Sequence, residues 1–265
     1  MKNVLLLVHQ DSGQEARLQA ALDLTSALSG HLACLDVTPL PLVFDSGMAL
    51  GPPVVIDQAE QEAANKARLQ RRLADEDVSW SWQDLSDDFA PAVIEAANGA
   101  DVIVLNRKLD SSSRPDMRAI ASEVLTHSTA LVVAVDEQCP GIDVTKPALI
   151  AWDGSDEAMH AVRRALPLLK LASKVRIFQA GAGLKDAVPV GDAALFLSRH
   201  GIYAETETRP GDNPVVAAIC EAAKRLGAGY CVMGAFGHSR FREALLGAAS
   251  RDMLSEAPLP LMMAH

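Results

Sequence analysis

Three glycines near the C-terminal end of the sequence have a spacing that suits phosphate binding. They stand in M-G-A-F-G-H-S-R-F-R-E-A-L-L-G-A-A-S-R-D-M-L, where two residues separate Gly234 from Gly237 and nine separate Gly237 from Gly247. Glycine adopts positive φ without strain and lets backbone N–H groups approach an anion closely. A short apolar run ends at Met233, so the glycines follow a predicted strand. The spacing therefore indicates a phosphate-binding loop at a strand end.

A carboxylate at the end of another predicted strand would complete such a site. The run P-A-L-I-A-W-D-G-S predicts a strand near 147–152 with Asp153 at its end. Ser155 precedes Asp156 and Glu157, which is the pattern of a helix N-cap. Open α/β sheets bind ligands at the carboxyl ends of the strands, where the strand order reverses. We therefore expect Asp153 near the glycines; the alternative is that it caps the turn that follows.

The sequence offers little for metal binding or nucleophilic catalysis. Its seven histidines show neither H-x-x-x-H nor H-E-x-x-H spacing, so we expect no metal site. Ser12 and Ser155 lack the G-x-S-x-G surroundings of a nucleophile, and we expect no catalytic residue. His238 directly follows Gly237, so it either faces a phosphate or is an exposed loop histidine.

The predicted elements around these residues alternate between strand and helix. Short apolar runs without clean alternation predict strands that are covered on both faces. In the first half, strands are expected near 3–8, 32–37, 79–84, 101–105 and 130–135. In the second half, strands are expected near 147–152, 174–179, 203–208, 229–234 and 259–264, and helices near 156–170, 186–200, 213–226 and 240–256. This alternation predicts a parallel, doubly wound sheet with right-handed crossovers.

The two halves of the sequence repeat one another. G-A-D-V-I-V-L-N at 99–106 matches G-A-G-Y-C-V-M-G at 227–234, and the openings of the two halves also match in order. A short polar segment near 136–146 predicts the boundary, which gives domains 1–138 and 145–265. We expect two tandem open parallel five-stranded sheets flanked by helices, with the halves forming an internal pseudo-dimer.

The first half lacks the features that indicate a phosphate site. Asn106 stands where Gly234 stands in the second half, and no G-x-x-G follows it. Gln10 lies near the position of Asp153, with Asp11 next to it. We interpret the first half as a degenerate copy. Basic residues after its fourth strand either hold an anion or belong to a solvated loop: Arg107, Lys108 and Arg114.

Composition limits the classes of partner. The chain has 265 residues, 49% of them apolar, and a formal net charge of −10, so phosphate backbones and anionic lipids would repel it. No apolar stretch reaches the roughly 18 residues of a membrane span, and the N-terminal run lacks the pattern of a signal peptide. Four scattered cysteines without a C-x-x-C pair fit a reduced compartment. We expect a cytoplasmic protein with no nucleic-acid or membrane partner.

Two segments between the first-half strands stand out. The loop at 38–56 is apolar and proline-rich, so it either forms a flap over a groove, forms a wedge between the halves, or packs on the surface. The charged segment near 56–76 predicts a helix with a solvated face.

Taken together, these motifs resemble the universal stress protein family, and specifically its tandem two-domain members. The resemblance covers nearly the whole chain and is best in 147–265. Nucleotide-binding members of the family carry G-x2-G-x9-G-[S/T], matched here by Gly234, Gly237 and Gly247, and a first-strand aspartate that corresponds to Asp153. The resemblance implies an adenine nucleotide alpha hydrolase-like (Rossmann-like) fold, ATP or a related nucleotide in the second half, and a role in the stress response.

The sequence departs from the family motif at one position. Ala248 stands where the family has Ser or Thr, so a hydroxyl donor to phosphate is missing, worth about 1.5–3 kcal/mol. Ser250 aligns with another small hydroxyl position and is the candidate to replace it. The expected nucleotide-binding residues are Asp153, Gly234, Gly237, His238, Gly247, Ala248 and Ser250.

Two other functions stay open at this point. The chain is alternatively a structural or interaction protein that binds a client or a second copy of itself through sheet edges near 130–135 and 259–264. Slow ATP hydrolysis is a weaker hypothesis, because the sequence shows no convincing general base.

Overall fold

The computed structural model describes most of the chain. It covers residues 1–38, 52–108, 116–181, 187–209, 214–235 and 246–265, without the side chains of 52–59 and 246–248. Gly237, His238 and most of the apolar loop at 38–56 lie outside the described residues. The interpretation of that loop as a flap or a wedge therefore stays a prediction.

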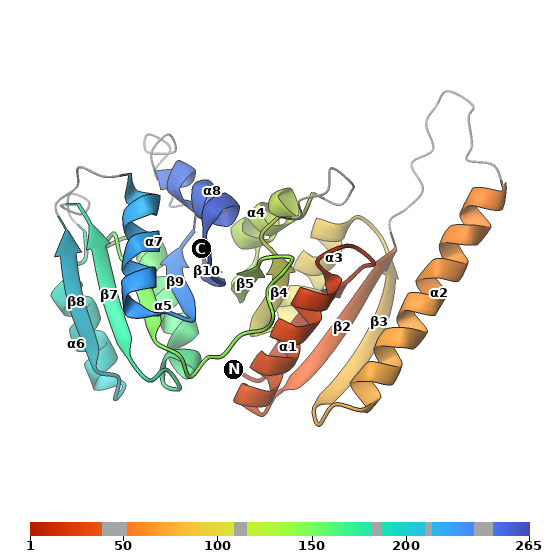
Figure 1. The fold of residues 1–265 in the computed structure, drawn as a ribbon, viewed down its shortest axis with the longest axis horizontal. Coiled ribbons are helices and arrows are strands. Elements are labelled where there is room, and N and C mark those ends of the chain that lie inside the picture. The colour runs from red at the N-terminus through yellow and green to blue at the C-terminus, as the bar shows by residue number, and fades with distance from the viewer. Residues whose placement is uncertain (39–51, 109–115, 182–186, 210–213, 236–245) are drawn as a thin grey trace.

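The strands form one ten-stranded sheet (Figure 1), in the order β3-β2-β1-β4-β5-β10-β9-β6-β7-β8. The first half contributes β1 (Asn3–Val8), β2 (His31–Thr38), β3 (Ser79–Ser86), β4 (Val102–Asn106) and β5 (Leu131–Val135). The second half contributes β6 (Ala148–Ala151), β7 (Val175–Ala180), β8 (Ala204–Arg209), β9 (Tyr230–Gly234) and β10 (Leu261–Ala264). Within each half the five strands are parallel and follow the same order, which confirms the predicted α/β class.

Helices cover both faces of this sheet. One face packs against α1 (Gln14–Leu28), α2 (Pro52–Ala74), α5 (Asp156–Leu169) and α6 (Val190–Arg199). The other packs against α3 (Phe89–Ala96), α4 (Met117–His127), α7 (Val215–Leu226) and α8 (Leu246–Glu256), with the short 3-10 turn η1 (Ala97–Gly99) after α3. Neighbouring strand residues such as Leu5 and Leu6 enter different apolar clusters, so strands buried on both faces explain the apolar runs without alternation.

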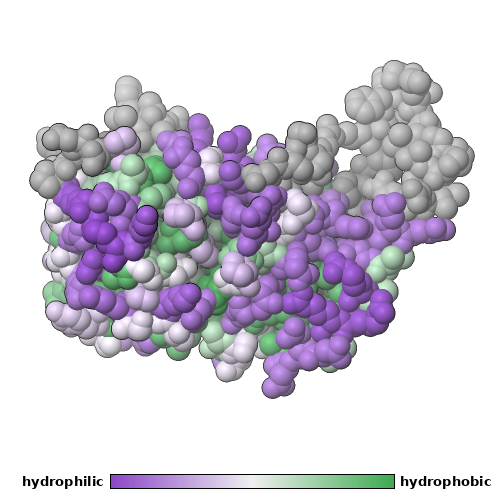
Figure 2. Space-filling model, viewed as in Figure 1, coloured by the Kyte–Doolittle hydropathy of each residue, from purple (hydrophilic) through white to green (hydrophobic). Residues whose placement is uncertain are grey.

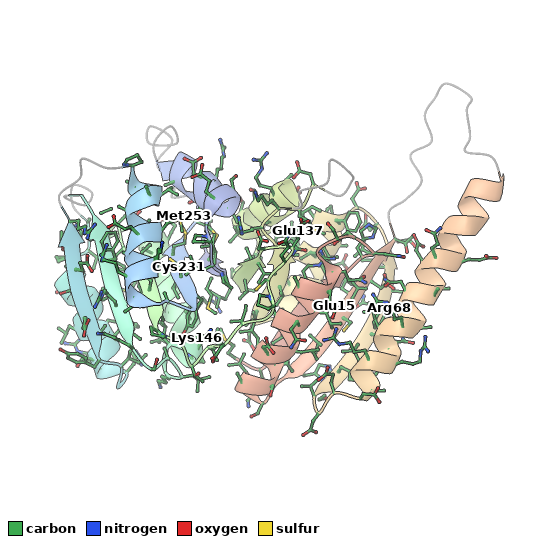
Figure 3. The ribbon with its side chains drawn as sticks, in the orientation of Figure 1. Glu15, Arg68, Glu137, Lys146, Cys231 and Met253 are labelled. Atoms are coloured by element: carbon green, nitrogen blue, oxygen red, sulfur yellow. The ribbon has the colours of Figure 1, made fainter. Side chains whose placement is uncertain are left out.

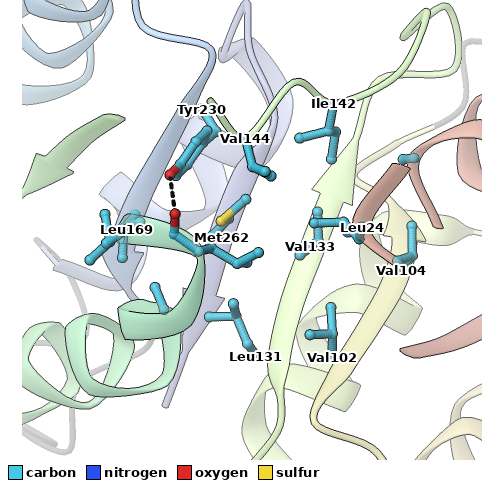
Figure 4. Close-up of a cluster of buried hydrophobic side chains, with 14 of the residues drawn as sticks. Leu24, Val102, Val104, Leu131, Val133, Ile142, Val144, Leu169, Tyr230 and Met262 are labelled. Atoms are coloured by element: carbon cyan, nitrogen blue, oxygen red, sulfur yellow. Dashed lines mark hydrogen bonds between the residues drawn. The ribbon is translucent and has the colours of Figure 1, made fainter. Parts of the chain in front are cut away.

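The two halves are joined edge to edge along a seam, which we define as the paired strands β5 and β10. This pairing is antiparallel, with Met262 opposite Val133. Apolar side chains from both halves and from the linker between them pack around it (Figure 4), and Tyr230 Oη donates a hydrogen bond to the Leu168 carbonyl at 3.3 Å. The edges near 130–135 and 259–264 are thus paired with each other, and the expectation that they bind a partner chain was wrong.

The linker between β5 and β6 lies against the first half. Ile142 and Val144 are buried, and the Ile142 amide donates to Asp23 Oδ2 at 2.7 Å. Gly141 has φ +138°, and a Cβ there would lie 2.3 Å from Asp23 Oδ2, so this position requires glycine. The linker is therefore a packed part of the core.

Helix α2 begins earlier than predicted, at Pro52, and presents the expected solvated face. Leu69 and Leu73 are fully buried against the sheet, whereas Arg68 and Arg71 are exposed. The region over α1 and α2 is mostly hydrophilic (Figure 2). Glu15 of α1 faces Arg68 of α2 across this surface, with 3.8 Å between their charged atoms (Figure 3).

The four cysteines are free thiols. Burial raises the pKa of Cys34 and of Cys231 to about 12, so both remain protonated and act as small apolar residues. Among the helices that the structure describes, none combines the length and the apolar composition that a membrane span requires.

Candidate functional site

The strand order of the second half reverses between β6 and β9, and we call the carboxyl ends of these two strands the second-half switch point. The two strands are paired in parallel, with Ala151 opposite Met233. The segment after Ala151 and the segment after Met233 therefore leave the sheet side by side. Parallel sheets bind ligands at this place because loops and helix N-termini converge there.

Asp153 shapes the turn between β6 and α5. Its Oδ1 accepts from the Ser155 amide at 2.9 Å and from the Ser155 hydroxyl at 2.6 Å. Ser155 Oγ in turn accepts from the Ala158 amide at 3.1 Å, which confirms Ser155 as the N-cap of α5. Oδ2 of Asp153 makes no hydrogen bond or ion pair within the described residues. Among the described contacts, one carboxylate oxygen thus holds the turn.

The segment at Ala187 and Val188 packs over this turn and is hydrogen-bonded to it. Gly154 has φ +82°, and a Cβ there would lie 2.5 Å from Ala187 Cβ, so only glycine fits. The Val188 amide donates to the Gly154 carbonyl at 2.9 Å, and the Trp152 indole donates to the Val188 carbonyl at 3.1 Å. Sequence reasoning missed Trp152 and Val188; the Asp-Gly pair that signals a tight turn was the available clue.

Backbone packing alone explains why residue 234 is glycine. A Cβ on Gly234 would lie 2.6 Å from the Ala158 nitrogen and 2.8 Å from the Glu157 carbonyl carbon. The end of β9 therefore touches the first turn of α5 with no room for a side chain. The first glycine of the motif is required by this packing whether or not a ligand binds.

Ser250 is a buried hydroxyl near the start of α8. Its exposed fraction is 4%, and within the described residues its hydroxyl makes no hydrogen bond. Helical spacing places it on the same side as Met253 and Leu254, which are fully buried in the apolar cluster. Ser250 therefore lies on the sheet-facing side of α8, one turn closer to the helix start.

The rest of the glycine motif is only partly described. Gly247 and Ala248 belong to the first turn of α8, so their amides are at a helix N-terminus, where unpaired N–H groups favour anions. Gly237 and His238 lie in the segment that the structure does not describe, and their roles stay predictions. In the described part of the chain, no group of His, Cys, Asp or Glu could hold a metal ion.

The equivalent switch point of the first half is occupied by a buried arginine. Arg17 is fully buried and donates from two guanidinium nitrogens to both oxygens of Asp11, at 2.9 Å each. It also donates to the Leu7 carbonyl at 3.1 Å and the His9 carbonyl at 3.0 Å, and to Asn106 Oδ1. Sequence reasoning missed Arg17 because a charged residue in a helix suggests a solvated position.

Asn106 and Asp11 show how the two halves differ. Asn106 ends β4 as Gly234 ends β9, and a Cβ on Gly13 would lie 2.3 Å from Asn106 Oδ1. The Gly13 amide donates to Asp11 Oδ1 at 2.8 Å, the same kind of turn that Asp153 makes. Asp11 is thus the counterpart of Asp153, and the expectation that Gln10 lies near that position needs correction. The loop after β1 is longer than the loop after β6, so counting from the strand ends placed Gln10 and not Asp11 opposite Asp153.

Arg107 is neither a solvated residue nor an anion site. It is 6% exposed, donates to the Leu254 carbonyl of α8 at 3.2 Å, and pairs with the Asp136 carboxylate. Its Nε is buried without a hydrogen bond within the described residues. Arg107 therefore links the end of β4 to the second half. Arg114 lies outside the described residues.

Solved structures match the whole arrangement. A universal stress protein from Archaeoglobus fulgidus DSM 4304 is similar over 99% of this chain and 97% of its own, with a TM-score of 0.75 and 16% identity. A functionally unknown protein from Pseudomonas aeruginosa PAO1 is similar over 100% of this chain and 92% of its own, with a TM-score of 0.64 and 16% identity. These likenesses show the fold of both halves. A comparison with curated proteins gave no match.

One further similar structure holds a ligand. It is a universal stress protein in complex with cAMP, similar over 46% of this chain and 99% of its own, with a TM-score of 0.36 and 22% identity.

The sheet and its two unequal switch points define a tandem Rossmann-like α/β protein, in which one half is closed by Arg17 and the other is not. Residues 145–265 match the family model described as the universal stress protein family. The second half thus matches that family, and the first half has the same fold as the similar solved structures.

Proposed function

We propose that the second half binds one adenine nucleotide per chain, ATP or a close relative. Asp153 accepts from the ribose hydroxyls through Oδ2. The backbone amides around Gly234, Gly247 and Ala248 hold the phosphates, and the Ser250 hydroxyl replaces the donor that Ala248 lacks. A role in the stress response and a cytoplasmic location are part of the same proposal, because the second half matches the family model.

The observation that carries this proposal is the difference between two aspartates in the same kind of turn. Both Asp11 oxygens are bound by Arg17, so that carboxylate is neutralised within the protein. Among the described residues no cation pairs with Asp153, and its contacts there use Oδ1 alone. The second-half switch point therefore retains an acceptor that the first half has lost.

The phosphates belong beside α8 and not at the start of α5. The N-terminus of α5 is already capped by Ser155, and Asp156 and Glu157 place negative charge in its first turn. The N-terminus of α8 carries no acidic residue in its first turn. Ser250 adds a donor on the buried side of this helix.

Isothermal titration with ATP tests the role of Asp153. Asp153→Asn keeps an oxygen for the turn but loses the carboxylate, so affinity falls about ten- to a hundredfold. Asp143→Asn is the matched control, because Asp143 Oδ1 accepts from the Thr145 amide at 3.0 Å and the Thr145 hydroxyl at 2.6 Å, in the same geometry but in the linker. Equal loss in both variants, or none in Asp153→Asn, contradicts the assignment.

A further inference from the structure

A cavity of about 310 Å³ lies beside α5, close to the seam. Both halves contribute to it: Thr129, two residues before β5, comes from the first half, and the remainder come from α5 and the end of β10. Its lining residues are Thr129, His160, Arg163, Arg164, Ala264 and His265. This cavity is distinct from the switch point, because it borders the second and third turns of α5 and not the Asp153 turn.

The lining is basic, although the chain carries a net charge of −10. Two arginines and two histidines face the cavity, and none of its lining residues is acidic. Arg163 lies over the Phe196 ring, with its guanidinium carbon 5.8 Å from the ring centroid, which holds the side chain in place. Within the described residues, neither Arg163 nor Arg164 forms an ion pair or hydrogen bond.

Arg164 lowers the pKa of Asp101, but the Asp101 carboxylate makes its hydrogen bonds elsewhere. Burial alone would raise the pKa of Asp101, but the amides of Asn3 and Lys2, and then nearby positive charge that includes Arg164, lower it overall. Asp101 Oδ2 accepts from the Lys2 amide at 2.6 Å and the Asn3 amide at 3.0 Å. Asp101 thus remains ionised and makes its hydrogen bonds with the Lys2 and Asn3 amides, without a hydrogen bond to Arg164 within the described residues.

The internal repeat allows the surroundings of α5 to be compared with those of α1. In the first half, the chain that leaves β5 runs back along α1, where the Ile142 amide binds Asp23 and Ile142 is buried. In the second half, the end of β10 at Ala264 borders the cavity beside α5. The linker thus packs against α1 through Ile142, whereas basic residues line the cavity beside α5.

We propose that this cavity binds a compact oxyanion, a phosphate or a carboxylate group. Its volume is at the lower end of the range of about 300–1,000 Å³ for ligand pockets, which suits a small anion better than a whole nucleotide. Arginine guanidinium groups present two parallel donors that match such oxygens. The Thr129 hydroxyl and the His160 imidazole add further donors.

Titration with inorganic phosphate at constant ionic strength, followed by NMR of the histidine side chains, tests this proposal. We expect saturable shifts of the His160 signal, and at least about tenfold weaker binding in Arg163→Gln/Arg164→Gln. Lys170→Gln removes an exposed charge at the end of the same helix and leaves the affinity within about twofold of the wild type. Titration with citrate shows whether carboxylates bind as phosphate does.

Three further measurements keep this test separate from nucleotide binding and from misfolding. Arg163→Gln/Arg164→Gln retains the ATP affinity of the wild type while its phosphate binding falls, which distinguishes this site from the switch point. Arg164→Gln alone retains the contact between Arg163 and Phe196 and still weakens binding. Circular dichroism confirms that each variant is folded. Unsaturable shifts, or equal phosphate affinity in the double variant and in Lys170→Gln, overturn the proposal.

Discussion

Two residues, Asp153 and Arg17, decide how the halves of this protein differ. Each half has an aspartate that accepts from the N-cap amide of the following helix, at Asp11 and at Asp153. In the first half Arg17 also binds both carboxylate oxygens of Asp11, whereas no arginine among the described residues binds Asp153. The Arg17 guanidinium thus occupies the first-half switch point, and burial lowers the pKa of the neighbouring His9, which keeps that side chain neutral.

Removing the internal cation should damage the first half. Arg17→Met leaves the Asp11 carboxylate, which is 5% exposed, without its partner, so we expect a loss of about 3–5 kcal/mol in unfolding free energy. Urea denaturation measures this loss. Arg68→Met is the control, because Arg68 and Glu15 are an exposed pair 3.8 Å apart and their loss changes stability by less than about 1 kcal/mol. Similar values for the two variants would refute the role of Arg17.

Gly234 provides a second test at the residue scale. Gly234→Ala forces a Cβ against the backbone of Ala158 and Glu157, so we expect a loss of about 1–3 kcal/mol. Gly191→Ala is the opposite case, since Gly191 lies in α6 with nothing within 4 Å of an added Cβ, and alanine there stabilises by about 0.5–1 kcal/mol. Thermal unfolding of both variants checks the pair, and a neutral Gly234→Ala contradicts the packing seen here.

At the scale of elements, charged side chains affect the stability of the sheet edge formed by β2, β3 and α2. Asp36 of β2 and Asp84 of β3 are direct partners across the two strands. Lys66 of α2 binds Asp84 at 2.6 Å, and the Trp82 indole also donates to it. Burial and the charge of Asp84 raise the pKa of Asp36 to about 6, with Glu62 adding to the rise and Lys66 opposing it.

The raised pKa of Asp36 predicts that the free energy of unfolding depends on pH. The folded pKa of Asp36 lies above its ordinary value of 3.8, so the folded state binds the proton more tightly than the unfolded state does. Stability is therefore lost as pH rises from about 4 through about 6. Asp36→Asn removes this loss, and we expect it to be about 1–2 kcal/mol more stable than the wild type at pH 7.5, a value reduced for partial exposure.

Urea denaturation at pH 4 and pH 7.5 measures the pH effect. At pH 4 the variant and the wild type differ little, because Asp36 is then largely protonated in the folded state. A stability difference that does not change between the two pH values contradicts the assignment to Asp36.

The sequence predicted the elements well and their side-chain environments unevenly. Runs such as A-L-I-A and Y-C-V-M predicted β6 and β9 within two residues, because strands buried on both faces must be apolar throughout. The burial of Arg17 and of Arg107 was not predicted, because burial of a charged side chain depends on partners far away in the sequence, Asn106 for one and Leu254 for the other. The Asp153 turn was predicted from its local pattern alone.

At the scale of the whole molecule, the seam makes one body from two halves. Strand pairing between β5 and β10 was outside the reach of the sequence, which marked both segments as edges without indicating which edges meet. The buried linker residues Ile142 and Val144 extend this contact onto α1. The internal pseudo-dimer that the repeat predicts is therefore formed within a single chain.

The seam also predicts the behaviour of a fragment. Residues 145–265 produced alone would expose the unpaired β10 edge, whose four residues are all buried in the full chain. An apolar open edge favours pairing with a second copy, so we expect concentration-dependent association in light scattering. The full chain, in which β5 covers this edge, is the control and should not associate in this way. A fragment that stays monomeric at all concentrations contradicts this view of the seam.

The central claim is that one half binds a nucleotide and the other does not. Equilibrium dialysis of the full chain against ATP tests it most directly, because it counts the nucleotides bound to each chain. The structure predicts saturation at one ATP per chain, since Arg17 occupies the first-half switch point and Asp153 is open in the second. Saturation at two, or no binding at millimolar ATP, would contradict the account.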